Sequence, residues 1–144
     1  MPFTRPRILI VDHEVDNGEM LPIWLDRNGT KYDFTTCYSS REARDLTEAK
    51  CFDLYILDYL MPDVTGAQLC SSLRMLAPNV PIIIYSAMNT PAVRKECYES
   101  GVDRYLLKPD DMDLLASTVE DLLYHRVKHF AVRQPQRFRP RSIV

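Results

Sequence analysis

Short apolar runs alternate along the chain with stretches in which apolar residues recur every three or four positions. This alternation is typical of β-α-β units built on a parallel sheet. The most apolar runs, Ile8–Val11 and Ile82–Ile84, contain no polar residue, which favours strands covered by helices on both faces. The sequence predicts strands at Ile8–Val11, Asp33–Cys37, Leu54–Leu57, Pro81–Tyr85 and Arg104–Leu107. The second of these is the most polar, so we expect it at an edge of the sheet.

Helix-capping patterns mark the segments between these strands. The expected caps are Ser39, Thr65, Thr90 and either Asp110 or Asp111 at helix starts, and Gly29 and Gly101 at helix ends. Pro22 falls inside the first helix, where it removes a backbone donor, so we expect that helix to be kinked or shortened. The apolar positions of the fifth helix continue through Val127 and Phe130, which predicts a helix that overruns the domain.

These elements predict an α/β fold, a five-stranded parallel sheet in a flavodoxin-like doubly wound (βα)5 arrangement. We take the strand order 2-1-3-4-5 from that known arrangement rather than from the residues. Right-handed crossovers then bring the carboxyl ends of all strands to one edge of the sheet, where ligands bind in such folds. We divide the chain into an N-terminal arm (1–6), one domain (7–125) and a basic C-terminal extension with a tail (126–144).

Charge is unevenly distributed between the domain and this tail. Residues 125–144 hold six basic residues and no acid, so the remaining 124 residues carry 12 basic against 20 acidic side chains. The tail lacks helical or strand periodicity near its end, and charge runs of this kind usually form solvated arms. We therefore expect at most non-specific electrostatic contact with nucleic acid.

The sequence contains no apolar run of about 20 residues and no signal-peptide pattern. Its four cysteines are widely spaced and form no C-x-x-C pair, which favours reduced thiols over a disulfide or zinc framework. We expect a cytoplasmic protein without a membrane partner.

Four reactive side chains follow the predicted strands at the carboxyl edge: Asp12, Asp58, Ser86 and Lys108. Any one of them alone is an ordinary cap or turn residue, whereas four in this order point to a common site. The turn after the first strand carries carboxylates and no glycine loop. This disfavours a nucleotide binder or a small flavodoxin-like enzyme and suits a hard cation.

This set fits the transfer of a phosphoryl group to a carboxylate, a reaction that needs positioning and charge neutralisation. Asp58 is the expected nucleophile. Asp12, one oxygen of Asp58 and the backbone carbonyl of Leu60 would hold Mg²⁺. Lys108 would supply a second positive charge, and Ser86 would donate its hydroxyl to a phosphoryl oxygen.

Four segments resemble the successive motifs of the response regulator receiver domains of two-component signal transduction. They are Ile8–Asp12, Leu57–Gly66, Ile84–Ala87 and Tyr105–Pro109, within roughly residues 7–125. The resemblance implies a phosphoprotein switch rather than an enzyme, limited to self-phosphorylation from a donor and self-dephosphorylation. It implies phosphorylation of Asp58 by a sensor histidine kinase or a phosphotransfer protein. It also implies a signal relayed through the fourth helix, fifth strand and fifth helix to an output domain or partner protein.

The resemblance carries two further implications. The Lys108-Pro109 peptide is expected to be cis, which proline makes accessible. Tyr105 corresponds to the switch aromatic, whose ring moves as Ser86 is drawn toward the phosphoryl group. A static, half-buried Tyr105 is the alternative, and homodimerisation, the cognate kinase and the output stay open.

The chain departs from the family pattern after the first strand, where receivers carry two consecutive acids and this chain has His13. Imidazole is a poorer ligand than carboxylate for Mg²⁺ and suits Mn²⁺ better, although Glu14 is a nearby substitute. Two interpretations follow: a working phospho-switch with weakened Mg²⁺ affinity, or a receiver-like interaction module that has lost its metal chemistry. Leu60 and Met88 are apolar and predict a phosphorylated state shielded from water.

Overall fold

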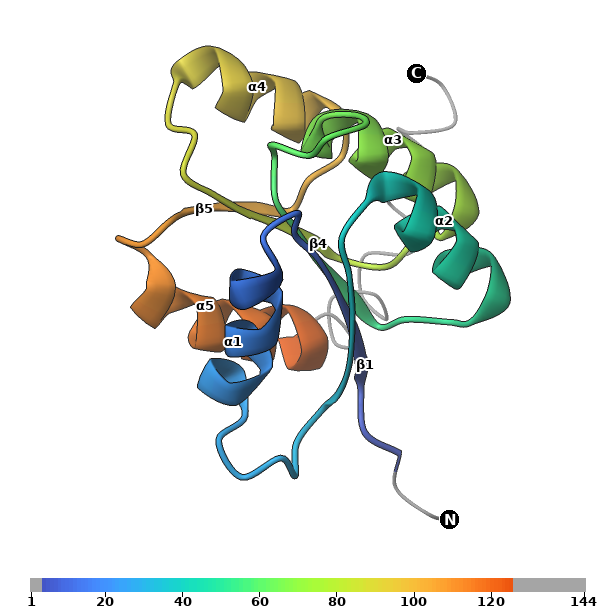
Figure 1. Cartoon of the computed structure of the whole chain (residues 1–144), viewed down its shortest axis with the longest axis vertical. Helices are drawn as coiled ribbons and strands as arrows, with labels where there is room; N and C mark the ends of the chain where they lie inside the picture. Colours follow the sequence, from blue (N-terminus) through green and yellow to red (C-terminus); the bar gives the residue numbers. More distant parts are fainter. Residues whose placement is uncertain (1–3, 126–144) are drawn as a thin grey trace.

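The computed structural model describes residues 4–125 and contains a parallel sheet between two layers of helices (Figure 1). The strands are β1 (Arg7–Val11), β2 (Asp33–Cys37), β3 (Leu54–Leu57), β4 (Ile82–Ser86) and β5 (Arg104–Leu107). Their order in the sheet is β2-β1-β3-β4-β5, and every neighbouring pair is parallel. The predicted fold and strand order are confirmed, and the polar strand β2 lies at an edge.

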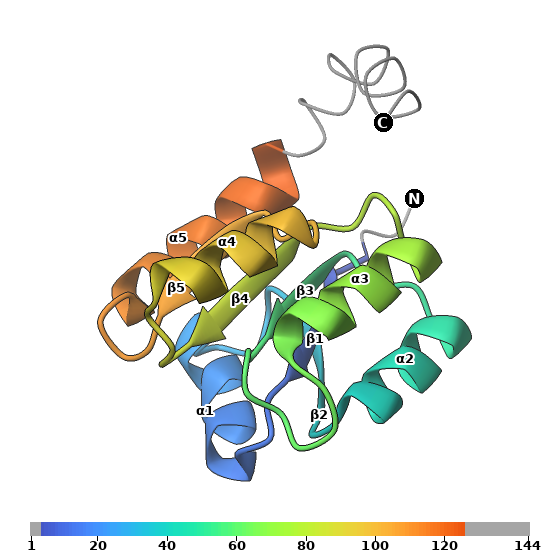
Figure 2. The same cartoon turned by 90° about the horizontal axis from the view of Figure 1, so that it is seen from above.

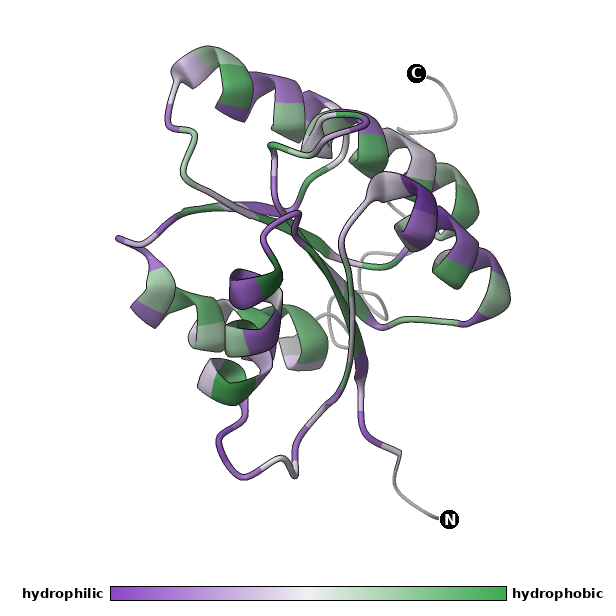
Figure 3. Cartoon of the chain, in the orientation of Figure 1, coloured by the Kyte–Doolittle hydropathy of each residue, from purple (hydrophilic) through white to green (hydrophobic). Residues whose placement is uncertain are grey.

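The helices are α1 (Val15–Leu25), α2 (Ser40–Ala49), α3 (Gly66–Leu76), α4 (Pro91–Glu99) and α5 (Met112–Glu120). Seen from above, α1 and α5 cover one face of the sheet and α2, α3 and α4 cover the other (Figure 2). Each layer encloses its own hydrophobic core. Figure 3 shows hydrophobic residues along the central strands and a mixture of hydrophobic and hydrophilic residues along the helices.

The apolar runs of the central strands reflect these two cores. Successive side chains of a strand point to opposite faces of the sheet. In β1, Leu9 and Val11 pack under α2 and α3, while Ile8 and Ile10 pack under α1 and α5. All four are 0% exposed. Because both faces are covered, a polar residue within β1 would be buried on either side.

The expected helix starts at Ser39, Thr65 and Thr90 are confirmed, since each side chain accepts a hydrogen bond from a backbone N–H in the first turn. Thr65 forms a complete capping box with Gln68. The expected cap of α5 is confirmed only in position. Asp111 occupies the N-cap but its side chain makes no cap hydrogen bond, because the carboxylate accepts a hydrogen bond from the backbone N–H of Leu107 at 2.9 Å instead.

Pro22 does not end α1, which continues to Leu25. The backbone N–H of the C-cap residue Asp26 donates a hydrogen bond to the Pro22 carbonyl. Strand bounds differ from the prediction by one residue in β1, which begins at Arg7, and in β4, where Ser86 is the last residue of the strand rather than the first after it. Gly101 follows the C-cap of α4 and has positive φ, as expected of a residue that ends a helix. The expected helix end at Gly29 was wrong: its φ is positive, but α1 ends at Leu25 with Asp26 as its C-cap, and Gly29 lies in the turn that follows.

A π-helical turn, η1 (Asp121–His125), follows α5 and ends the described part of the chain. The predicted helical overrun and the basic tail lie outside the residues described. Within residues 4–125, no helix is long and apolar enough to cross a membrane.

Gly66, the first residue of α3, lies directly against the backbone that carries Asp58. A Cβ at this position would collide with the carbonyl oxygen of Asp58 and lie 2.8 Å from the Cα of Tyr59. The obstacle is backbone, which cannot turn aside as a side chain can. The start of α3 therefore fixes how closely the segment after β3 approaches it.

We expect Gly66→Ala to lower the free energy of unfolding by about 2 kcal/mol, as overpacking a tight contact does. Urea unfolding followed by circular dichroism measures the change. Gly18→Ala is the control. Its Cβ would meet a ring carbon of Tyr38 at 3.2 Å, and the helical gain of about 1 kcal/mol from alanine opposes any loss. Equal destabilisation by the two substitutions would contradict the steric role of Gly66.

Candidate functional site

The carboxyl edge of the sheet brings together two carboxylates and one ammonium group. Asp12 and Asp58 follow β1 and β3, whose final residues Val11 and Leu57 are paired in register. Lys108 follows β5, and its Nζ donates to Asp12 Oδ2 at 2.6 Å and to Asp58 Oδ2 at 3.1 Å. Three residues predicted from widely separated segments therefore meet at one point.

All three side chains are largely shielded from water. The exposed fraction is 14% for the Lys108 side chain, 3% for Asp12 and 5% for Asp58. Burial raises the pKa of Asp12 above its ordinary value, although hydrogen bonds from Lys108 and from the Glu14 backbone oppose the shift. Burial alone would lower the pKa of Lys108, but the Asp12 hydrogen bond and the Asp58 charge outweigh it and the pKa is raised. The ammonium form of Lys108 is thus held in place.

The two carboxylates lie close to the ring of His13. Asp12 Oδ1 accepts from the Glu14 N–H at 2.9 Å, and Asp58 Oδ1 accepts from the Leu60 N–H at 3.3 Å. His13 Nδ1 lies 3.9 Å from Asp12 Oδ1 and 3.7 Å from Asp58 Oδ2. Ligand atoms of Asp12, His13 and Asp58 all lie within 4.8 Å of one another. Two carboxylates fit a hard divalent cation, and an imidazole beside them extends the set to softer metals.

Ser86 lies at the same edge on β4 and is fully buried. Its carbonyl accepts from the Lys108 N–H at 2.8 Å, which ties the ends of β4 and β5 together. Its hydroxyl oxygen accepts from the Met88 N–H at 3.3 Å. Ser86 is thus placed beside Lys108, with its hydroxyl bound to the loop that leads into α4. The Lys108-Pro109 peptide is cis, as expected.

Tyr105 points inward and is 4% exposed. It is therefore more buried than the static, half-buried ring that was the alternative to a switch residue. Its hydroxyl donates to the Met88 carbonyl at 2.6 Å, and the Arg94 guanidinium carbon lies 4.6 Å from the centre of its ring. Burial raises the pKa of Tyr105 to about 12. The ring therefore connects the Ser86-Met88 segment to α4, while its motion stays a prediction.

Sequence reasoning missed two aromatic residues at this site. Tyr85 places its ring 5.6 Å from the Lys108 Nζ, within the range of a cation-π contact. Tyr59, directly after Asp58, donates its hydroxyl to Glu96 Oε1 at 2.8 Å. Adjacency to Asp58 and Ser86 was the only available signal, because the partners come from distant segments.

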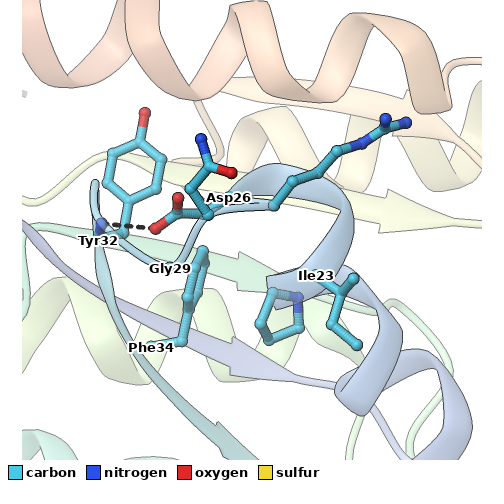
Figure 4. Close-up of a pocket in the computed structure, with 8 residues that line it drawn as sticks. Ile23, Asp26, Gly29, Tyr32 and Phe34 are labelled. Atoms are coloured by element: carbon cyan, nitrogen blue, oxygen red, sulfur yellow. Dashed lines mark hydrogen bonds between the residues drawn. The ribbon is translucent and has the colours of Figure 1, made fainter.

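A separate pocket of about 330 Å³ is lined by residues from the end of α1 to the start of β2 (Figure 4). Its carboxylate, Asp26, accepts hydrogen bonds from the backbone N–H groups of Thr30, Lys31 and Tyr32. Asp26 is therefore used to shape the turn before β2.

The parallel sheet in the order β2-β1-β3-β4-β5 defines a flavodoxin-like α/β domain, and the Asp-Asp-Lys cluster lies at the carboxyl ends of its strands, where such domains bind ligands. The family model for the response regulator receiver domain matches residues 8–120. The chain therefore belongs to the response regulator receiver domain family, and it is a signalling switch rather than a conventional enzyme.

Curated relatives and solved structures agree with this family. Transcriptional regulatory protein ZraR of Salmonella typhimurium is 32% identical over 82% of this chain, which spans 26% of that protein. Response regulator MprA of Mycolicibacterium vanbaalenii is 32% identical over 81% of this chain and 50% of its own length. The chain thus spans half or less of these relatives. The crystal structure of a two-component response regulator from Clostridium difficile superposes with a TM-score of 0.77, at 27% identity, over 85% of this chain and 98% of that one.

We expect Lys108→Met to lower the free energy of unfolding by about 3 kcal/mol near pH 7, because it leaves two buried carboxylates without a counter-charge. Without the ammonium, the pKa of Asp12 rises further above the ordinary value of 3.8. The folded variant then binds more protons than the unfolded chain, so its deficit shrinks as the pH falls toward that value. In the wild type, the contribution of Lys108 to the free energy of unfolding is fully present below pH 10.5. It is lost as the pH rises through the raised pKa of Lys108.

Urea unfolding at several pH values measures both trends. Lys95→Met is the control, because Lys95 forms an exposed pair with Glu99 at 4.0 Å and its loss costs less than about 0.5 kcal/mol. A Lys108→Met deficit that is the same at every pH would contradict the electrostatic account.

Proposed function

We propose that this domain accepts a phosphoryl group on the carboxylate of Asp58 and passes the signal on through α4, β5 and α5. The single observation that carries the proposal is the Lys108 ammonium, which bridges Asp12 and Asp58 within a buried edge of the sheet. Phosphoryl transfer places negative charge on non-bridging oxygens, and a fixed cation at that point stabilises it.

In this proposal each side chain has a role that its position supports. Asp58 attacks the phosphorus of the donor through one carboxylate oxygen. The new O–P bond gives an acyl phosphate as the bond from phosphorus to the donor breaks, and the donor leaves with that electron pair. Lys108 exchanges part of its contact with the carboxylates for a phosphoryl oxygen, and Ser86 turns its hydroxyl from Met88 toward another. Tyr105, bonded to the Met88 carbonyl, then follows the loop.

Asp12, Asp58 and the Leu60 carbonyl would hold Mg²⁺, with His13 as an additional ligand that favours Mn²⁺. The cation, when bound, neutralises phosphoryl oxygens that Lys108 does not reach. One ammonium beside two carboxylates leaves the cluster with a residual negative charge, and this charge supports a cation site.

The proposed phosphodonor is a sensor histidine kinase or a phosphotransfer protein in the cytoplasm. The proposed receiver domain spans residues 7–125, and the output lies in a further domain or a partner protein. The relatives named as regulatory proteins are two to four times longer than the matched region, which supports an output domain of that kind. The alternative, an interaction module without phosphorylation, is not favoured because Asp12, Asp58 and Lys108 are all present and assembled.

The test is to incubate the full chain with acetyl phosphate and Mg²⁺ or Mn²⁺ and to measure its intact mass. We expect the wild type to gain one phosphoryl group. Asp58→Asn should gain none, because an amide is not a nucleophile toward phosphorus. Equal labelling of Asp58→Asn, or no labelling of the wild type with either metal, would overturn the proposal.

We expect His13→Asp to tighten Mg²⁺ binding by about tenfold, equivalent to ~1.4 kcal/mol, because a carboxylate replaces a neutral ligand. Isothermal titration calorimetry in the absence of phosphodonor measures the dissociation constant. His13→Asn is the control that removes the ring without adding charge. Indistinguishable Mg²⁺ affinities for wild type and His13→Asp would show that His13 does not limit the site.

We expect slow self-dephosphorylation, because Leu60 and Met88 are apolar and flank the site, although the Leu60 side chain is about half exposed. Leu60→Asn should shorten the half-life of the phosphorylated state severalfold, since an amide can orient an attacking water. The decay is followed by intact mass after removal of the phosphodonor. Faster decay in the wild type than in Leu60→Asn would contradict the shielding.

A further inference from the structure

Helix α4 is attached to the domain with little buried apolar surface. Cys97 is its only fully buried residue. The partly buried Val93 also packs against this core. The remaining attachments are polar or aromatic: Arg94 over the Tyr105 ring, the Tyr98 hydroxyl that accepts from the Tyr105 N–H at 3.1 Å, and Glu96 with Tyr59. Segments held by few apolar contacts open and shift at low free-energy cost. The polar contacts therefore have a large influence on where α4 rests.

Tyr59 connects α4 to the residue that follows the phosphoryl acceptor. Its side chain is almost fully buried, and its hydroxyl donates to Glu96 Oε1 at 2.8 Å. Its carbonyl accepts from the Gly66 N–H at 2.7 Å, so its backbone is anchored to the start of α3. The hydrogen bond to the Glu96 carboxylate is the main reason that the pKa of the Tyr59 phenol is raised.

We propose that the Tyr59-Glu96 hydrogen bond is a second connection between the phosphorylation site and α4, acting beside the connection through Ser86, Met88 and Tyr105. This inference rests on the proposed phosphorylation of Asp58. The two connections start from different strands, β3 and β4, and reach α4 at different residues. Each therefore carries part of the coupling between the site and the helix.

The position of Tyr59 gives the physical reason. Asp58 and the Leu60 carbonyl, the proposed phosphoryl and cation ligands, lie on either side of it in the chain. Peptide planes are stiff, so a change at both neighbours reorients the Tyr59 backbone as a unit. A tyrosine ring has only two rotatable bonds and transmits such a change to its hydroxyl. Glu96, near the middle of α4, then follows or loses its donor.

A purely static role for this hydrogen bond makes a different prediction. A fastener between β3 and α4 would alter the resting stability of α4 without altering its response to phosphorylation. A coupling element alters the response itself, because coupling between two sites is a difference between states. The response of α4, rather than its resting protection, separates the two roles.

The experiment is hydrogen-deuterium exchange of α4 amides in the full chain, with and without Mg²⁺ and beryllofluoride, a mimic of a bound phosphoryl group. The variants are Tyr59→Phe, which keeps the ring and removes the donor, and Glu96→Gln, which removes the charge of the acceptor. Glu99→Gln is the matched control, since Glu99 lies on the same helix in an exposed pair with Lys95. Mass gain with acetyl phosphate is measured for every variant.

We expect beryllofluoride to change α4 exchange in the wild type and in Glu99→Gln to the same extent. Tyr59→Phe and Glu96→Gln should each reduce that change by about half, and the double variant should reduce it no further, because the two residues form one contact. Adding Tyr105→Phe to Tyr59→Phe should reduce the change below that of either single variant.

A full response in Tyr59→Phe with normal Asp58 labelling would overturn this inference and leave the proposed function standing. A loss of response in Glu99→Gln equal to that in Glu96→Gln would overturn it as well, since the effect would then belong to the helix and not to the contact. Absence of labelling in the wild type would overturn the proposed function and this inference together.

Discussion

The contact of one ammonium with two carboxylates is the constraint on which this domain depends. Lys108 allows Asp12 and Asp58 to lie side by side in a buried edge of the sheet, where two unpaired carboxylates would repel each other and lose hydration. Two carboxylates and one ammonium leave the cluster with a net negative charge, which attracts a cation. The Lys108 ammonium in the same cluster attracts an anion. A phosphoryl group accompanied by a divalent metal ion satisfies both.

The fold leaves little freedom in how the residues of this cluster are placed. Parallel strands end at one edge, so β1, β3 and β5 deliver their following residues to a common place. Gly66 then fixes the approach of the segment after β3 from the α3 side, and the Ser86 carbonyl ties β4 to Lys108. Residues with a purely structural role thus determine the distances between Asp12, Asp58 and Lys108, on which the chemistry depends.

Most of this architecture is predictable from the sequence, because it follows from local pattern. Buried strands, capping residues and the order of Asp12, Asp58, Ser86 and Lys108 all have local signals, and the positions of their backbones are confirmed. The expected side-chain cap at Asp111 was wrong, because its carboxylate finds a backbone donor at Leu107. The contact of Tyr59 with Glu96 was not predictable, since it joins residues 37 positions apart without a periodic signal.

Membership of the receiver family gives the class of switch, and we propose that the aromatic contacts of α4 determine how this chain responds. The central claim is that Asp58 itself takes the phosphoryl group. The most direct test is borohydride reduction of the phosphorylated chain, which converts an acyl phosphate to an alcohol, followed by peptide sequencing in a mass spectrometer. The account predicts the reduced residue at position 58 and an unmodified Asp12. Reduction at another carboxylate, with Asp58 intact, would contradict it.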